Sequence, residues 1–171
     1  GLNNKHSLDN LSISGVVGWT GGLAGGGVID QSGTGELLLT GGVTSTGAAP
    51  KLLVLQGSTT GTGRMTGVIS QYGASVPVSL VKRGTGTWTL AASNTYTGGT
   101  TVSQGTLVLG NANAIGTGTL ILNQGATLNT TGDLTLPSLP KTWAGNFTYL
   151  GPNALDLGTG SVSLSARVVR L

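Results

Sequence analysis

The chain contains no cysteine and few charged or aromatic residues. The absence of cysteine excludes a disulfide framework, thiolate chemistry and cysteine-based metal sites. Charged residues make up 8% of the sequence and aromatic residues 4%, and among the eight cations only Lys82 and Arg83 are adjacent. Because nucleic-acid binding needs clustered basic side chains and aromatic platforms, we expect no nucleic-acid partner.

Long hydrophobic runs are also missing. No segment approaches the roughly 18 apolar residues that a membrane-spanning helix needs, so we expect that the chain does not span a membrane. The sequence begins at Gly1 without a charged and then apolar leader, which is typical of a processed or excised chain. Residues 1–10 are polar, and we expect them to form a loose arm or a cap.

What the chain does have is glycine, at 32 of its 171 positions, together with short aliphatic runs. The triplet Gly-Thr-Gly begins at positions 33, 61, 84, 116 and 158, so it recurs at uneven intervals, of which the last is the longest. Repeats of about 20 to 50 residues are typical of solenoids, in which glycine supplies the tight corners. The first three intervals fit one coil each, and the last fits two short coils or one coil with an insertion.

The apolar runs stay short and are broken by glycine before a helical period can develop. We therefore predict an all-β protein: a right-handed parallel β-helix (β-solenoid) of about five coils, forming a single domain over residues 1–171. Residues 137–152 are bounded by prolines and contain three of the seven aromatic residues. We expect this segment to be a lateral insertion or a partial cap.

Residues 80–109 hold three short strand candidates, at 87–90, 100–102 and 106–109, separated by turns rich in Gly and Asn. The stretch contains Lys82, Gly-Thr-Gly at 84–86, Leu90, Asn-Thr-Tyr-Thr-Gly-Gly-Thr at 94–100 and Gly-Thr-Leu at 105–107.

This ordered run resembles the autotransporter-associated β-strand repeat, also called the passenger-associated transport repeat, and residues 80–125 match it best. The resemblance implies a secreted bacterial β-helix, a passenger carried outside the cell by a separate membrane domain. We expect the chain to be a fragment of such a passenger or a protein with another export route.

Five scattered acids and a single histidine, His6, offer little for catalysis or for binding metal. Asp133 and Asp156 are separated in the sequence by close to one coil length, so we expect them on neighbouring coils. Glycoside hydrolysis uses two carboxylates that flank one bond, but turn or cap positions are the simpler interpretation of these aspartates. We predict no enzymatic activity, no cofactor and no metal site.

The alternative function is a polysaccharide-binding or polysaccharide-cleaving β-helix. Its candidate ligand-facing residues are Asp133 and Asp156 with the aromatic residues Trp143 and Tyr149, because aromatic rings provide an apolar face on which sugars stack.

The ends of a β-helix are open sheet edges, and open edges add strands unless they are capped. No capping helix is predicted and the charge is low, so we expect head-to-tail self-association, with Val168 and Val169 as candidate assembly residues. The predicted function is a non-enzymatic secreted structural module at the bacterial cell surface: a stalk, an adhesin segment or an extracellular fibre subunit. Cell-surface or matrix glycans are further expected partners.

Overall fold

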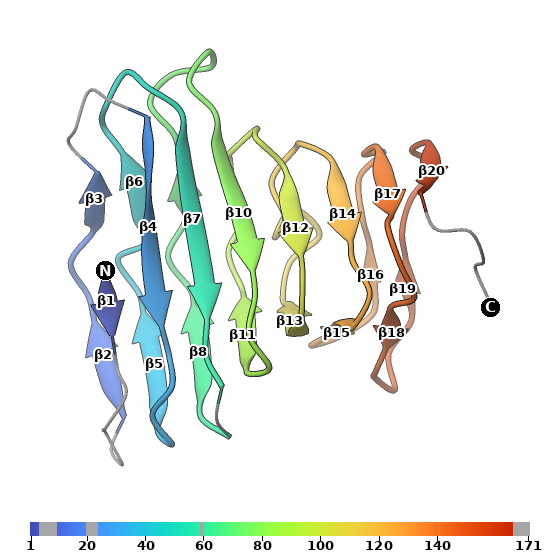
Figure 1. The fold of residues 1–171 in the computed structure, drawn as a ribbon, viewed down its shortest axis with the longest axis horizontal. Helices are drawn as coiled ribbons and strands as arrows, with labels where there is room; N and C mark the ends of the chain where they lie inside the picture. The colour runs from blue at the N-terminus through green and yellow to red at the C-terminus, as the bar shows by residue number, and fades with distance from the viewer. Residues whose placement is uncertain (4–9, 20–23, 59, 166–171) are drawn as a thin grey trace.

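The computed structural model describes residues 1–3, 10–19, 24–58 and 60–165. In this part of the chain every regular element is a β-strand, and strands one coil apart pair in parallel (Figure 1). The longest sheet, which we call sheet A, contains, in spatial order, β1 (Leu2–Asn3), β4 (Gly25–Asp30), β7 (Lys51–Gln56), β10 (Val78–Lys82), β12 (Thr100–Val102), β14 (Leu120–Leu122), β17 (Lys141–Trp143) and β20 (Val162–Leu164).

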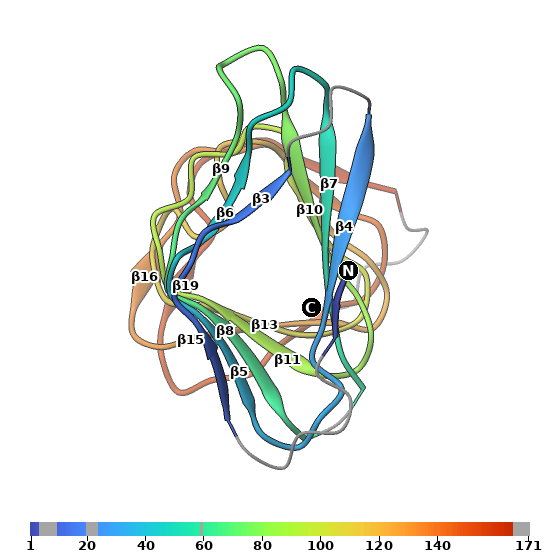
Figure 2. The same ribbon diagram turned by 90° about the vertical axis from the view of Figure 1, so that its left-hand side faces the viewer.

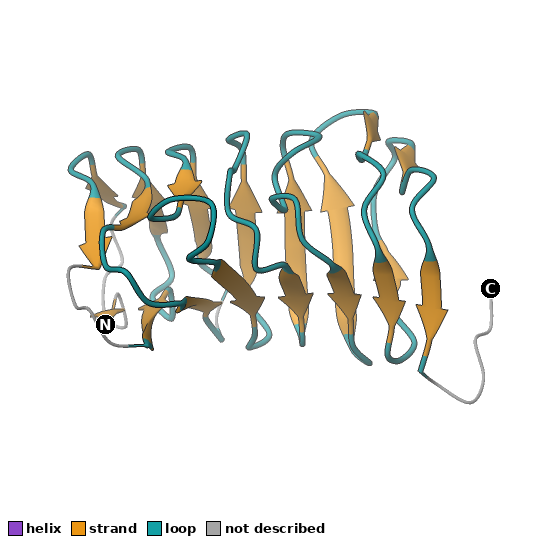
Figure 3. Cartoon of the chain, turned by 90° about the horizontal axis from the view of Figure 1, so that it is seen from above, coloured by secondary structure: helices purple, strands orange, loops and turns teal. Residues whose placement is uncertain are grey.

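Three further sheets complete the coils. Sheet B contains β2 (Leu11–Ile13), β5 (Glu36–Leu39), β8 (Thr62–Met65), β11 (Thr87–Leu90), β13 (Gly105–Leu109), β15 (Ala126–Thr130) and β18 (Thr148–Tyr149). Sheet C contains β3 (Val17–Trp19), β6 (Val43–Ser45) and β9 (Ile69–Ser70), and sheet D contains β16 (Leu134–Thr135) and β19 (Leu155–Asp156). Viewed along the stack, the strands surround a closed interior (Figure 2), and from above the coils lie side by side (Figure 3).

Buried and partly exposed residues alternate along the strands, and the buried ones build the core. In β11 and β12 the buried residues alternate with partly exposed ones, as expected for strands with one face toward a closed interior. Parallel register then stacks the inward residues of successive coils in columns. One column of sheet B contains Leu37, Gly63, Trp88, Leu107, Leu128 and Tyr149.

The coil length changes along the stack. Lys51 pairs with Val78 and Leu80 pairs with Thr100, so the coil that starts at Lys51 is longer than the coil that starts at Leu80. The early coils therefore have a wider outline, and Figure 2 shows the blue and green coils reaching beyond the yellow and orange ones. The later coils are shorter because sheet C ends at β9, and the coils of β11 and β13 have no strand at that side among the described residues.

The predicted fold class is confirmed: the chain is an all-β parallel solenoid. The stack is longer than the expected five coils because the later coils are short, so that eight strands fit into sheet A.

The segment 137–152 differs from the expectation of an insertion or partial cap. It contains β18 and most of a coil, and β17 within it pairs with both β14 and β20. The two final Gly-Thr-Gly copies occupy the same corner, just before β14 and β20 of sheet A, two coils apart. The long interval between them therefore consists of two short coils.

The amino-terminal segment is described only in part. Leu2–Asn3 forms β1, which pairs with β4 at the edge of sheet A, and residues 4–9 lie outside the described part of the chain. No helix in the described residues is long and apolar enough to cross a membrane.

Candidate functional site

Asp133 and Asp156 lie on neighbouring coils, as the spacing predicted, and both are exposed. They are not aligned in register, because Asp156 pairs with Thr135. Asp133 Oδ1 accepts a hydrogen bond of 2.8 Å from the Ala154 N–H, and Asp156 Oδ1 accepts one of 2.8 Å from the Gly158 N–H. Each carboxylate thus satisfies a backbone donor at a turn, which is the typical role of aspartate in such positions.

Trp143 and Tyr149 both pack against the hydrophobic core and are only partly exposed. The Trp143 ring meets the Phe147 ring edge to face, with centroids 5.5 Å apart. The Tyr149 hydroxyl donates to the Asn153 carbonyl at 2.7 Å and lies 2.9 Å from Thr130 Oγ1. These contacts hold both aromatic side chains against the last coils. The candidate assembly residues Val168 and Val169 lie outside the described residues, as does the single histidine, His6.

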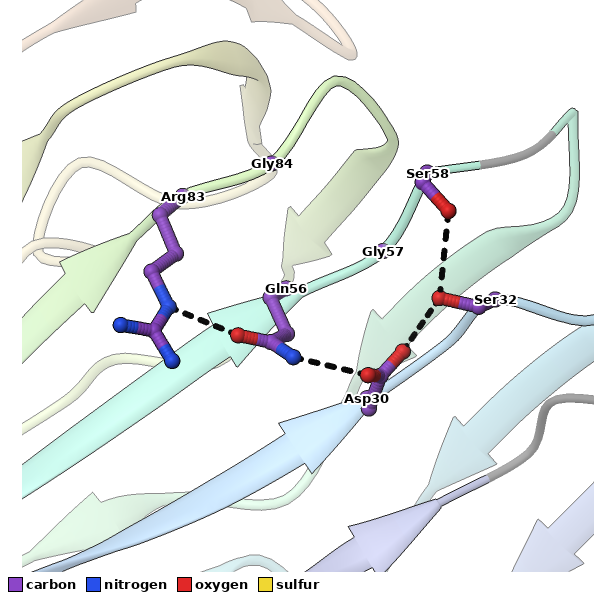
Figure 4. A pocket seen from close by; sticks show the side chains of 7 residues that line it. All are labelled: Asp30, Ser32, Gln56, Gly57, Ser58, Arg83 and Gly84. Atoms are coloured by element: carbon purple, nitrogen blue, oxygen red, sulfur yellow. Dashed lines mark hydrogen bonds between the residues drawn. The ribbon is translucent and has the colours of Figure 1, made fainter.

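A polar groove that the sequence analysis missed lies where β4, β7 and β10 end. Asp30 and Gln56 are in register, and Arg83 follows the last residue of β10. Gln56 Nε2 donates to Asp30 Oδ2 at 2.7 Å, and Arg83 Nε donates to Gln56 Oε1 at 2.7 Å (Figure 4). Three successive coils therefore carry one continuous ladder of hydrogen-bonded side chains.

Two serines at the following corners extend this ladder. Ser32 Oγ donates to Asp30 Oδ1, and Ser58 Oγ lies 3.5 Å from Ser32 Oγ (Figure 4). With Gly57 and Gly84 these residues line a pocket of about 530 Å³.

The sequence contains a signal for this groove. The triplets Val-Ile-Asp at 28–30, Val-Leu-Gln at 54–56 and Val-Lys-Arg at 81–83 recur at the coil period, and each ends in a polar residue.

Among the described residues, Lys82 is the charged side chain that the fold encloses most completely, at 0% exposure. It faces inward from β10, and its Nζ donates to the carbonyls of Gly84 at 2.8 Å, Gln104 at 2.9 Å and Arg83 at 3.1 Å. The ammonium group thus ties together the corners of two successive coils. Gly84 adopts a φ of +71° at this corner, a conformation that favours glycine.

Burial also sets the protonation of two core groups. Burial lowers the pKa of Lys82 from 10.5 to about 8. Burial raises the pKa of the Tyr96 phenol well above its usual value of 10.0. Both residues belong to the stretch that resembles the transport repeat, so this segment makes the stability of the fold depend on pH.

We expect the free energy of unfolding to rise between pH 8 and 10 and to fall above pH 10. In the lower range the unfolded chain keeps a proton on Lys82 that the folded chain has released, so raising the pH favours the folded chain. Above pH 10 the unfolded chain loses a Tyr96 proton that the folded chain retains. Each group contributes a slope of at most about 1.4 kcal/mol per pH unit. Urea unfolding followed by circular dichroism measures this profile.

Two variants assign the two limbs of the profile. Lys82→Met is expected to abolish the rise in the free energy of unfolding between pH 8 and 10. Tyr96→Phe is expected to abolish its fall above pH 10. A free energy that decreases steadily from pH 8 in the wild-type chain would contradict the assignment.

The described residues contain no group of three or more His, Cys, Asp or Glu side chains placed to hold a metal ion. The features that the structure brings together in the described residues are instead a polar groove on one wall and a buried ammonium group.

The fold thus places the chain in the class of parallel β-solenoids. Residues 80–109 match the family model described as passenger-associated-transport-repeat. The chain therefore carries a passenger-associated transport repeat, and the resemblance expected from its sequence is confirmed.

A curated relative extends the likeness over most of the chain. This chain is 36% identical over 165 residues to the "Adhesin BmaC autotransporter" of Brucella suis biovar 1 (strain 1330). The match covers 92% of this chain but only 4% of the relative, so the chain spans a small part of that protein's length. No solved structure matches the chain.

Proposed function

We propose that this chain is a rigid, non-enzymatic module of a surface-exposed autotransporter passenger. It serves as a stalk or adhesin segment outside the bacterial cell. The observation that carries the proposal is the unbroken parallel ladder of sheets A and B, which runs from the first described strands to the last. A solenoid of this kind forms an extended rod, because each coil stacks on its two neighbours. The transport repeat and the autotransporter adhesin relative support the surface location.

We further propose that the open ends of the stack bind the end coils of other copies of this chain, with their strands in parallel register. At one end β20 pairs with β17 and has no second partner strand among the described residues. Its apolar side chains remain accessible, Val162 at 45% and Leu164 at 58%. An exposed apolar edge of this kind is a template for strand addition. At the other end, β1 and β2 are the edge strands of sheets A and B.

The purified chain is expected to associate in a concentration-dependent way, with elongated species at high concentration. A double substitution, Val162→Lys with Leu164→Lys, is expected to leave a monomer, because charged side chains on an edge strand oppose strand addition. Sedimentation velocity across a wide concentration range, with electron microscopy of the same samples, measures both size and shape.

Leu52→Lys is the matched control. Leu52 is 39% exposed and also lies in sheet A, but β7 is paired on both sides, by β4 and β10. This variant should associate as the wild-type chain does. A wild-type monomer at every concentration, or equal loss of association in the control, would remove end-to-end assembly from the proposal.

A further inference from the structure

We propose that the groove formed by Asp30, Ser32, Gln56, Ser58 and Arg83 is a binding site for an acidic oligosaccharide with repeated uronic acid units. Arg83 would pair with a sugar carboxylate, and the amide and hydroxyl groups would bond to ring hydroxyls. This site is separate from the open ends, and it lies on different coils from the aspartates that the sequence suggested.

Of the two charged side chains that line the groove, Arg83 is the one exposed to solvent. Asp30 is only 7% exposed, and its two carboxylate oxygens already accept hydrogen bonds from Gln56 and Ser32. Arg83 is exposed and uses Nε for its bond to Gln56. Figure 4 shows its two terminal nitrogens without a hydrogen bond to the other groove residues. Two parallel N–H donors match the geometry of a carboxylate.

The neutral groups of the groove keep hydrogen-bonding capacity for a ligand. The Gln56 amide has two N–H donors, and Asp30 takes one of them. The exposed Ser58 hydroxyl retains acceptor capacity beside Ser32. A cluster of amide, hydroxyl and guanidinium groups suits a ligand that offers many hydroxyls and a carboxylate.

The spacing of the groove suits a chain of repeating units. Asp30, Gln56 and Arg83 come from equivalent positions on three successive coils, so a polar side chain recurs about every 4.8 Å along the stack. An extended polysaccharide advances by a similar distance per sugar, which allows consecutive sugars to meet consecutive coils.

The groove fits a peptide or a lipid poorly. It is lined by polar residues and glycines, and none of its lining residues has a large apolar side chain. The backbone of β7 is already paired with β4 and β10, so no free strand edge is available there for a peptide to extend.

Calorimetric titration of the folded, purified chain with tetragalacturonate tests the site. The methyl-esterified form of the same tetrasaccharide is the matched neutral probe. We expect the acid to bind about fivefold more tightly than the ester, since an ion pair with a solvent-exposed guanidinium contributes a modest attraction. Arg83→Gln should abolish this preference, and Arg83→Lys should restore only part of it because lysine lacks the planar fork.

Arg64→Gln is the control, since Arg64 is also exposed but lies on β8 in sheet B. It should leave binding unchanged. Equal binding of acid and ester, no binding of the acid at millimolar concentration, or equal losses in the Arg83 and Arg64 variants would overturn the proposal. Because the titration uses monomeric chain at low concentration, these outcomes are independent of end-to-end assembly.

Discussion

Replacing Gly63 by alanine is expected to lower the free energy of unfolding by about 3 kcal/mol, at the upper end of the range for overpacked cores. Gly63 and Trp88 are paired in register and both face the interior. A Cβ added at Gly63 would overlap the ring atoms Cδ2 and Cε2 of Trp88. The ring has little freedom to move, because Trp88 is 1% exposed and its Nε1 donates to the Gln56 carbonyl at 2.9 Å. Urea unfolding monitored by circular dichroism measures the loss.

A double substitution tests the cause of this loss. Trp88→Leu alone leaves a cavity and is expected to destabilise the fold by roughly 3 kcal/mol. Combined with Gly63→Ala it should destabilise by less than the sum of the two, since the smaller side chain makes room for the new methyl group. Gly132→Ala is the control, because a Cβ there has no heavy atom within 4 Å. Simple additivity of the two substitutions would contradict the steric explanation.

Replacing Asn94 by alanine is expected to destabilise the fold by roughly 2–6 kcal/mol, since two buried backbone groups lose their partner and each such loss costs about 1–3 kcal/mol. Asn94 is 3% exposed. Its Oδ1 accepts from the Ile69 N–H at 2.8 Å and its Nδ2 donates to the Ala114 carbonyl at 2.5 Å. The side chain thereby connects three coils where sheet C has ended.

Asn123→Ala provides the comparison, because the Asn123 side chain makes one long hydrogen bond, 3.4 Å, to Ser103 Oγ. Its effect should remain within about 0.5 kcal/mol, as for most substitutions outside the core. Asn94→Asp keeps the acceptor for Ile69 but loses the donor to Ala114, so an intermediate loss is expected. If the Asn94 and Asn123 variants were equally stable, Asn94 would not be the link between wide and narrow coils.

The sequence was sufficient to predict the fold class, because short alternating runs and glycine corners have few other solutions. Three strands of the repeat, at 87–90, 100–102 and 106–109, agree with β11, β12 and β13 to within one residue. The coil number was harder to predict because Gly-Thr-Gly marks different corners in the two halves. The first and third copies precede strands of sheet B and the second runs into β8 of the same sheet, whereas the last two precede strands of sheet A.

Surface chemistry was less accessible from sequence. Asp133 and Asp156 were candidate ligand-facing residues because their spacing approximates one coil. In the structure each carboxylate accepts a hydrogen bond from a backbone N–H group. The ladder of Asp30, Gln56 and Arg83 joins side chains that are far apart in the sequence, so it depends on the register of three strands. Which side chains meet in this ladder depends on the lengths of the coils that contain β4, β7 and β10, and these lengths follow from the strand register.

Immunogold labelling of intact bacteria that make the full-length protein, with antibodies raised against this folded chain, is the most direct test of its place outside the cell. A surface-exposed passenger predicts dense labelling of unpermeabilised cells, which protease treatment of those cells removes. Labelling that requires permeabilisation and resists external protease would place the chain inside the cell envelope and contradict its role as a surface module.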